Sequence, residues 1–147
     1  MIQRLFTILL FLIFNTQLSI YQNSALHFDA DNNKVSVSHN PVYNIGNEFT
    51  IEAWINAEAW RSEAWQGSIV AKDQQGPDAG FAFRAGKSGT LIFVMSVNNT
   101  WNEIQSSPKM NRRQWHHVAA VVNNGEMKLF IDGEQAARGT YSGMPSH

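Results

Sequence analysis

The fold of this chain is decided by residues 115–138, which read WHHVAAVVNNGEMKLFIDGEQAAR. Two dipeptides, Asn124-Gly125 and Asp132-Gly133, divide this stretch into three runs of β-forming residues. Both dipeptides suit two-residue hairpin turns, which require positive φ angles. The stretch therefore predicts three consecutive antiparallel strands that form a meander.

Another strand is predicted at residues 49–55, FTIEAWI, because apolar and polar side chains alternate there. Period-two alternation is typical of a strand with one buried face. One face of this strand carries Phe49, Ile51, Ala53 and Ile55, and the other carries Thr50, Glu52 and Trp54.

Further short β-rich runs, separated by turn residues, extend over most of the chain. They lie at residues 25–29, 34–38, 68–72, 81–85, 90–97 and 102–106. No segment longer than ten residues shows helical periodicity. Many short strands at regular spacing indicate an all-β sandwich or barrel.

The composition fits one globular domain. The chain has 147 residues, of which 44% are hydrophobic and 16% are charged, and this is enough for one substantial core. The net charge of -1 gives no sign of a basic patch, so no nucleic-acid partner is expected. The chain has no cysteine, which excludes thiolate metal sites and cysteine nucleophiles.

Residues 1–24 have the layout of a secretory signal peptide. Arg4 gives a positive start, residues 5–14 are almost entirely apolar, and residues 15–24 are polar with small side chains. The apolar run is shorter than the roughly 20 residues that a membrane-spanning helix needs. We therefore expect a secreted or cell-envelope protein whose domain, residues 25–147, has no stable membrane span. An uncleaved N-terminal anchor is the alternative.

Five segments, taken in order, resemble one known family. They are ALHFDADNNKVSVSHN (25–40), EFTIEAWI (48–55), GSIVAKD (67–73), GFAFRAGKSGTLIFVMS (80–96) and RRQWHHVAAVVNNGEMKLFIDGE (112–134). Together they resemble the LamG-like, laminin G-type jellyroll domain of the concanavalin A-like lectin/glucanase superfamily. The resemblance implies an all-β sandwich of two antiparallel sheets in a jellyroll. It also implies extracellular binding to glycans or other proteins, often as one module of a larger protein.

The end of the chain departs from that family. Domains of this kind usually continue past the last hairpin to a final strand pair, whereas residues 142–147, SGMPSH, read as a loop. The resemblance therefore predicts an incomplete domain that lacks the closing C-terminal strands, as in a truncated copy or a fragment of a longer product. Such a domain would leave a sheet edge uncovered, which favours pairing with another chain.

A ligand-binding surface is predicted where tryptophans fall in loops. Trp60, Arg61 and Trp65 lie in the loop at residues 56–67, and Trp101 lies in a polar turn. Exposed indoles can stack on sugar rings while a nearby arginine binds hydroxyl groups. The alternative is that these indoles plug an open end of the sandwich, because large aromatic side chains are usually well buried.

The strands carry other conspicuous side chains, which are assigned structural roles. Trp54 and Trp115 are expected to pack in the core. His116 and His117 are adjacent, so they point to opposite faces of a strand and cannot bind one ion together. A glycosidase on this fold would need two carboxylates facing one groove, and Glu52 stands alone on its strand.

Calcium is the one cofactor that the resemblance suggests. Asp29 follows Phe28 where the family often has a Phe-Asp-Gly segment that binds calcium, although Ala30 replaces the glycine here. Asp31 lies two residues further along the chain. Calcium takes six to eight oxygen ligands, so these two acids would supply only part of a site. The alternative is that they cap a turn.

The sequence therefore predicts a non-catalytic extracellular binding or adhesion module for a carbohydrate or protein ligand. A structural accessory domain, or a remnant of a larger secreted protein, is the second interpretation, and the abrupt end of the chain favours it. A glycoside hydrolase is the third and least favoured interpretation.

Overall fold

The structure of the protein, a computed structural model, describes residues 24–29 and 33–147. Contacts divide the chain into two units, residues 1–37 and residues 38–147. In the first unit, the described residues are exposed and form neither helix nor strand.

The strands predicted at residues 25–29 and 34–38 are therefore wrong. Their side chains alternate as a strand requires, but a strand exists only when its backbone is hydrogen-bonded to a neighbouring strand. Among the described residues, these two segments have no such neighbour. The predicted signal peptide lies outside the described residues over positions 1–23, so it stays a prediction.

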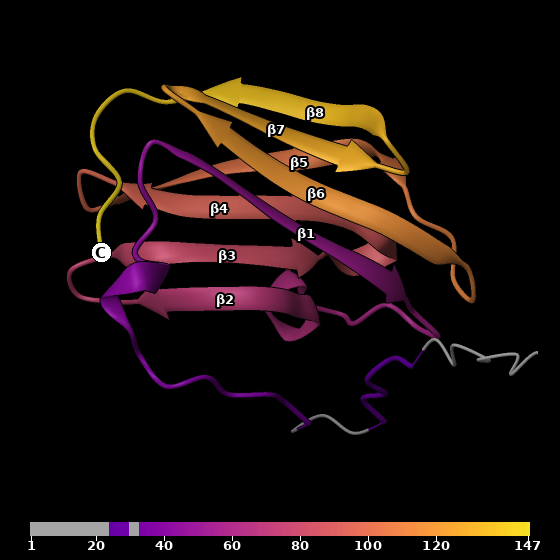
Figure 1. Cartoon of the computed structure of the whole chain (residues 1–147). Helices are drawn as coiled ribbons and strands as arrows, with labels where there is room; N and C mark the ends of the chain where they lie inside the picture. The colour runs from indigo at the N-terminus through magenta and orange to yellow at the C-terminus, as the bar shows by residue number, and fades with distance from the viewer. Residues whose placement is uncertain (1–23, 30–32) are drawn as a thin grey trace, which may run out of the picture. The chain divides into compact units, whose positions relative to one another are not determined.

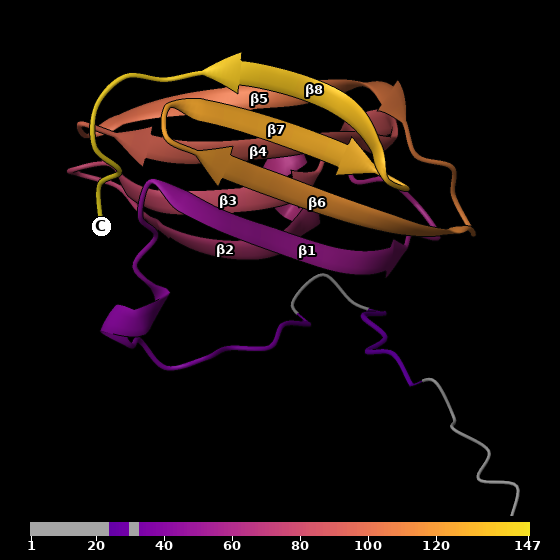
Figure 2. The same cartoon turned by 45° about the horizontal axis from the view of Figure 1, so that its top comes forward.

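Residues 38–147 fold into two antiparallel sheets of four strands each (Figure 1). The first sheet has the order β1-β6-β7-β8 and consists of Glu48–Asn56, Trp115–Asn123, Glu126–Ile131 and Glu134–Thr140. The second sheet has the order β2-β3-β4-β5 and consists of Ser68–Gln74, Ala79–Ala85, Thr90–Val97 and Thr100–Lys109. The two sheets lie face to face in both views (Figure 2). This confirms the predicted all-β, two-sheet class.

Helical structure in the described part of the chain is limited to short 3₁₀ turns. They are η1 (Pro41–Tyr43), η2 (Ala64–Gly67) and η3 (Lys87–Gly89). Across residues 24–29 and 33–147, no helix is long and apolar enough to cross a membrane.

The predicted meander is present as strands β6, β7 and β8. Asn124 and Gly125 have φ angles of 42° and 94°, and Asp132 and Gly133 have φ angles of 52° and 84°. Positive φ at both central residues is the geometry that lets a two-residue turn join strands of right-handed twist. The turn residues therefore explain why these three strands are consecutive neighbours.

One hydrophobic core lies between the two sheets. Its most deeply buried side chains are Phe83, Leu91, Phe93 and Met95 from the second sheet and Val118, Val122, Met127 and Leu129 from the first. The Phe93 ring lies 6.0 Å from that of Phe49 on the opposite sheet and 6.5 Å from that of Phe83 on its own. Burial of one such side chain contributes about 1.5–3 kcal/mol to the stability of the fold. Because residues of both sheets fill this core, both sheets depend on it.

The last residues of the chain are hydrogen-bonded to two strands of the second sheet. The carbonyl of Ser146 accepts the N–H of Gly80 at 2.8 Å, and its N–H donates to the Ser96 carbonyl at 3.0 Å. The Ser146 hydroxyl accepts the N–H of Asn99 at 2.8 Å. Residues 142–147 form no strand, as predicted, and these bonds hold them against the ends of β3 and β4.

Candidate functional site

The outward face of the first sheet exposes two tryptophans. On β1, half-buried residues that face the core alternate with exposed residues. Trp54 is on the exposed side with 66% of its surface accessible, and Trp115 at the start of β6 is 49% accessible. Exposed aromatic side chains that lie near one another on a surface commonly mark an interaction site.

The assignment of Trp54 and Trp115 to core packing is therefore wrong. Trp54 shares its face of β1 with Thr50 and Glu52, and Trp115 shares its face of β6 with His117. The alternation of polar and apolar residues in β1 carried this signal, because it put Trp54 on the polar side. The general tendency of tryptophan to be buried was the weaker guide.

Four side chains form a compact block on this face, which we call the tryptophan platform: Trp54, Asn56, Trp115 and His117. In the antiparallel pairing of β1 with β6, Trp54 lies opposite His117 and Asn56 lies opposite Trp115. Residues two apart on a strand share a face, so all four side chains project outward. The two tryptophans are diagonal neighbours, with backbones about 7–8 Å apart.

Polar groups border the indoles of the platform. The imidazole of His117 lies 5.3 Å from the Trp54 ring, centroid to centroid, with the two planes inclined by 55°. Nε2 of the same imidazole lies 3.4 Å from Oε2 of Glu52. Flat apolar rings edged by an imidazole, a carboxylate and the amide of Asn56 suit a ligand that has both apolar faces and hydroxyl groups.

Three of the four predicted ligand-binding residues lie in the connection between β1 and β2. Trp60 is half-buried and packs against the core, and its ring lies 2.9 Å from where a Cβ atom on Gly89 would be. The inward packing of Trp60 favours the alternative for this residue, while its part in ligand contact stays a prediction. Arg61 is exposed, and Trp65 on η2 is 64% accessible.

Trp101, the fourth predicted residue, does not join them. It lies on β5 opposite Ser96, close to the hairpin between β4 and β5. Gly89, which contacts Trp60, directly precedes the other end of β4. With eight residues, β4 is about 25 Å long. The two surfaces are therefore separated by the length of the sheet.

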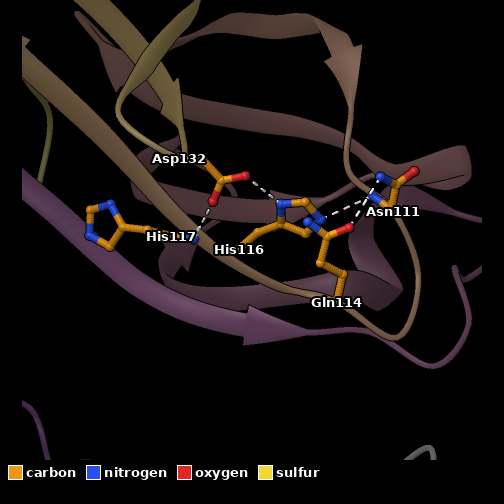
Figure 3. Close-up of polar contacts among 5 residues, drawn as sticks. All are labelled: Asn111, Gln114, His116, His117 and Asp132. Carbon is orange, nitrogen blue, oxygen red and sulfur yellow. Dashed lines mark hydrogen bonds and ion pairs between the residues drawn. The ribbon is translucent and has the colours of Figure 1, made fainter.

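His116 points away from His117 and is held in a buried hydrogen-bond network (Figure 3). It is 5% accessible, and its Nδ1 lies 2.7 Å from Oδ2 of Asp132. The backbone N–H of Asn111 donates to Nε2 at 3.1 Å. Because an N–H can only donate, Nε2 is the unprotonated nitrogen and Nδ1 donates to the carboxylate. The predicted opposite orientation of the two histidines is confirmed.

Asp132 also accepts the backbone N–H of His117, at 2.9 Å (Figure 3). The hydrogen bond from His116 holds the pKa of Asp132 below its usual range; burial acts in the opposite direction, and the His117 N–H adds to the lowering. The ionised carboxylate thus ties the turn between β7 and β8 to the start of β6. Each oxygen of this carboxylate accepts one hydrogen bond from the protein, which gives the acid a structural role.

The calcium prediction concerns two acids, of which the structure describes one. Asp29 is exposed, and its Oδ1 accepts a hydrogen bond from Nδ2 of Asn33 at 2.6 Å. Asp31 lies outside the described residues. Within the described ranges, no group of three or more His, Asp or Glu side chains could hold a metal ion. Calcium binding therefore stays a prediction, to which Asp29 would supply one carboxylate.

Two face-to-face antiparallel sheets define this domain as a β-sandwich, and the outer face of one sheet exposes two tryptophans. Residues 29–147 match the family described as the concanavalin A-like lectin/glucanases superfamily, of the laminin G type, and the chain belongs to this family. The predicted resemblance is thereby confirmed. Domains of the laminin G type are commonly binding modules for proteins or glycans and are typically extracellular. A search of curated proteins gives no match.

Proposed function

We propose that this chain is a non-catalytic extracellular module that binds carbohydrate on the tryptophan platform. The observation that carries the proposal is the exposure of Trp54 and Trp115 on the outer face of a regular sheet. A sugar ring has an apolar face of C–H groups and a rim of hydroxyls. The platform offers the complementary arrangement of apolar rings with polar side chains at their edges.

The position of the platform on two paired strands favours binding with little loss of entropy. The β1–β6 pairing is continuous from Glu48 opposite Asn123 to Asn56 opposite Trp115, without a bulge. The backbone under both indoles is therefore fixed before the ligand arrives. Tryptophan has only two side-chain torsions, so ordering its ring on binding costs less than ordering a long flexible side chain.

Two acids of the first sheet are held in the ionised form by protein donors. A glycosidase needs one carboxylic acid with a raised pKa to protonate the leaving group. The pKa of Glu126 and the pKa of Asp132 are both lowered, so neither of these two side chains suits that role. The hydrogen bond from Lys128 is the main cause at Glu126, and the bond from His116 is the main cause at Asp132.

The test is binding of the secreted chain to a panel of soluble and insoluble polysaccharides, compared with two platform variants. We expect Trp54→Ala and Trp115→Ala each to weaken binding about tenfold, which corresponds to about 1.4 kcal/mol per lost stacking contact. Neither change should alter the unfolding midpoint by much, because exposed side chains contribute about 0.5 kcal/mol or less.

Trp65→Ala is the matched control, because Trp65 is as exposed as Trp54 but lies on η2. It should leave binding unchanged. If Trp65→Ala abolished binding while the platform variants did not, the ligand would bind the β1–β2 connection and the platform would not be the site. Absence of binding to every polysaccharide would contradict the carbohydrate proposal as a whole.

A further inference from the structure

The turn between β6 and β7 is hydrogen-bonded to two other segments of the domain. The backbone N–H of Asn124 donates to the Asn47 carbonyl at 2.8 Å, and its Nδ2 donates to Oε1 of Glu48, the first residue of β1. The carbonyl of Gly125 accepts the N–H of Tyr141, which directly follows β8, at 2.9 Å. We call these three contacts the turn clasp. They join the start of β1 and the end of β8 to one two-residue turn.

The residues at the centre of the clasp form a chemically reactive pair. Asn124-Gly125 is the only Asn-Gly dipeptide in the sequence. In such a pair the backbone nitrogen of the glycine can attack the side-chain amide carbon of the asparagine, because glycine has no Cβ to hinder the approach. Asn124 is exposed, and Gly125 lies outside the β6–β7 ladder, whose last pair is Asn123 with Glu126. The two reacting groups are therefore neighbours on a surface turn.

The reaction at this turn needs only water. The nitrogen of Gly125 forms a bond to Cγ of Asn124, the bond from Cγ to Nδ2 breaks, and ammonia leaves with the proton that the glycine nitrogen gives up. The product of this step is a cyclic imide. Water then opens the ring, at the side-chain carbonyl to give aspartate or at the backbone carbonyl to give isoaspartate.

The turn between β7 and β8 provides a comparison within the same chain. Its Asp132-Gly133 pair also has positive φ at both residues, and an Asp-Gly pair forms the same imide by losing water from a protonated carboxyl. The carboxylate of Asp132, however, accepts hydrogen bonds from His116 and His117, and the bond from His116 holds its pKa below the usual range. An ionised carboxylate resists attack by a nucleophile. The structure therefore distinguishes two turns that have the same signs of φ.

We propose that Asn124 is a site of spontaneous deamidation and that its conversion opens the turn clasp. An ionised aspartate has no side-chain N–H to donate, and it places a second negative charge against the carboxylate of Glu48, which repels it. Isoaspartate lengthens the backbone of a turn whose two residues must match the twist of the strands. Either product weakens the connection between β1 and the β6–β7 turn. This inference is independent of the proposed carbohydrate binding.

The first test follows the chemistry in the wild-type chain. The purified full chain is incubated at mildly alkaline pH, and peptide mapping then measures aspartate and isoaspartate at each asparagine, with released ammonia as a second readout. We expect Asn124 to be converted at least about tenfold faster than any other asparagine. The rate should rise with pH, because the attacking nitrogen must lose its proton. Asp132 should form no isoaspartate under the same conditions.

The second test measures the effect of the product on the fold. Asn124→Asp reproduces one product directly, and we expect it to lower the urea midpoint of unfolding. Adding Glu48→Gln removes the facing negative charge and should restore part of this loss. The matched control is Asn99→Asp, because Asn99 is also an exposed turn residue, with a φ of 58°, but lies between β4 and β5. It makes the same change in charge and should leave the midpoint nearly unchanged.

Three results would overturn the inference. The first is an intact Asn124 in the folded chain when the same residue is converted in the chain unfolded in urea, because the native turn would then prevent the reaction. The second is isoaspartate at Asp132 as early as at Asn124. The third is an equal loss of stability in Asn124→Asp and Asn99→Asp, which would show that the clasp contributes nothing.

Discussion

The carboxylate of Asp132 joins the turn between β7 and β8 to the start of β6, and through His116 it is linked to the loop that precedes β6. It accepts the imidazole N–H of His116 and the backbone N–H of His117, and His116 in turn accepts the N–H of Asn111. His116 is the buried member of this network, and an unpaired nitrogen on its imidazole would cost about 1–3 kcal/mol. One ionised side chain therefore sets the geometry of the loop that precedes the platform residue Trp115.

The charge of Asp132 should make this geometry depend on pH. Because its folded-state pKa is lowered, its stabilising contribution is complete above the unfolded-state pKa, about 3.9, and is lost as pH falls through the folded-state value. Asp132→Asn keeps an acceptor for His117 and tolerates the φ of 52°, but it removes the charge. We expect a loss of about 1 kcal/mol at pH 7, near the low end for charged hydrogen bonds, because the side chain is 47% accessible.

Urea unfolding of both proteins at pH 7 and at pH 3 would measure this effect. The difference between wild type and Asp132→Asn should narrow at pH 3. Glu134→Gln, an exposed charge removal two residues away, is the control and should change little at either pH. An equal difference at both pH values would show that the charge of Asp132 contributes nothing.

For individual residues, the sequence showed which face of a strand a side chain takes. It did not show which residues from other strands that side chain contacts. The alternation of residues 49–55 correctly assigns Phe49 and Ile51 to the core side of β1. The same alternation puts Trp54 outside, although residue type alone favoured burial. The residues next to Trp60 in the sequence do not show that it packs on Gly89. Nor do the neighbours of Trp101 show that this residue lies at the other end of β4, about 25 Å from Gly89. Both positions depend on how the strands pair.

At the scale of elements, β2 leaves no room for a side chain at Gly80 of β3. A Cβ atom at this position would collide with the backbone carbonyl of Lys72 on β2. Gly80 also has a φ of 88°, a backbone angle that residues other than glycine rarely adopt. The pairing of these strands at Asp73 opposite Gly80 therefore requires glycine for two separate reasons.

The two reasons can be separated with a matched pair of substitutions. Gly133 has a nearly identical φ of 84°, but no atom lies within 4 Å of its Cβ position. Gly133→Ala should lose about 1–2 kcal/mol from backbone strain alone. Gly80→Ala should lose about 1–3 kcal/mol more because of the collision. Denaturant unfolding measures both, and equal losses would mean that β2 moves aside without cost.

The elements themselves were predictable wherever turn residues separate them and a neighbouring strand is present. The strand predicted at 90–97 coincides with β4, and the three strands of the meander begin within one residue of their predicted starts. Residues 25–29 and 34–38 carry the same alternation and yet form no strand. The alternation of polar and apolar residues predicts which face of a strand each side chain would take. A strand forms only if its backbone can also hydrogen-bond to the edge of a neighbouring strand.

At the scale of residues 38–147, the sheets have no separate cores, so they should unfold together. Phe93 of β4 contacts both Phe49 on the opposite sheet and Phe83 on its own. Truncation of a fully buried phenylalanine costs about 3–5 kcal/mol. We expect Phe93→Ala to lower the free energy of unfolding by that amount. Both sheets should still unfold together in a single transition.

Far-UV circular dichroism follows the strands of both sheets, and tryptophan fluorescence follows the surroundings of five indoles, of which Trp54 and Trp115 lie on the first sheet and Trp101 on the second. Coincident curves are the signature of two-state unfolding. Phe28→Ala is the control: Phe28 is 52% accessible in the first unit, so its loss should change stability by about 0.5 kcal/mol or less. If the two curves did not coincide in Phe93→Ala, the two sheets would be able to unfold one without the other. The platform would then rest on a sheet that can open by itself, and ligand binding would have to supply the order that we ascribe to the fold.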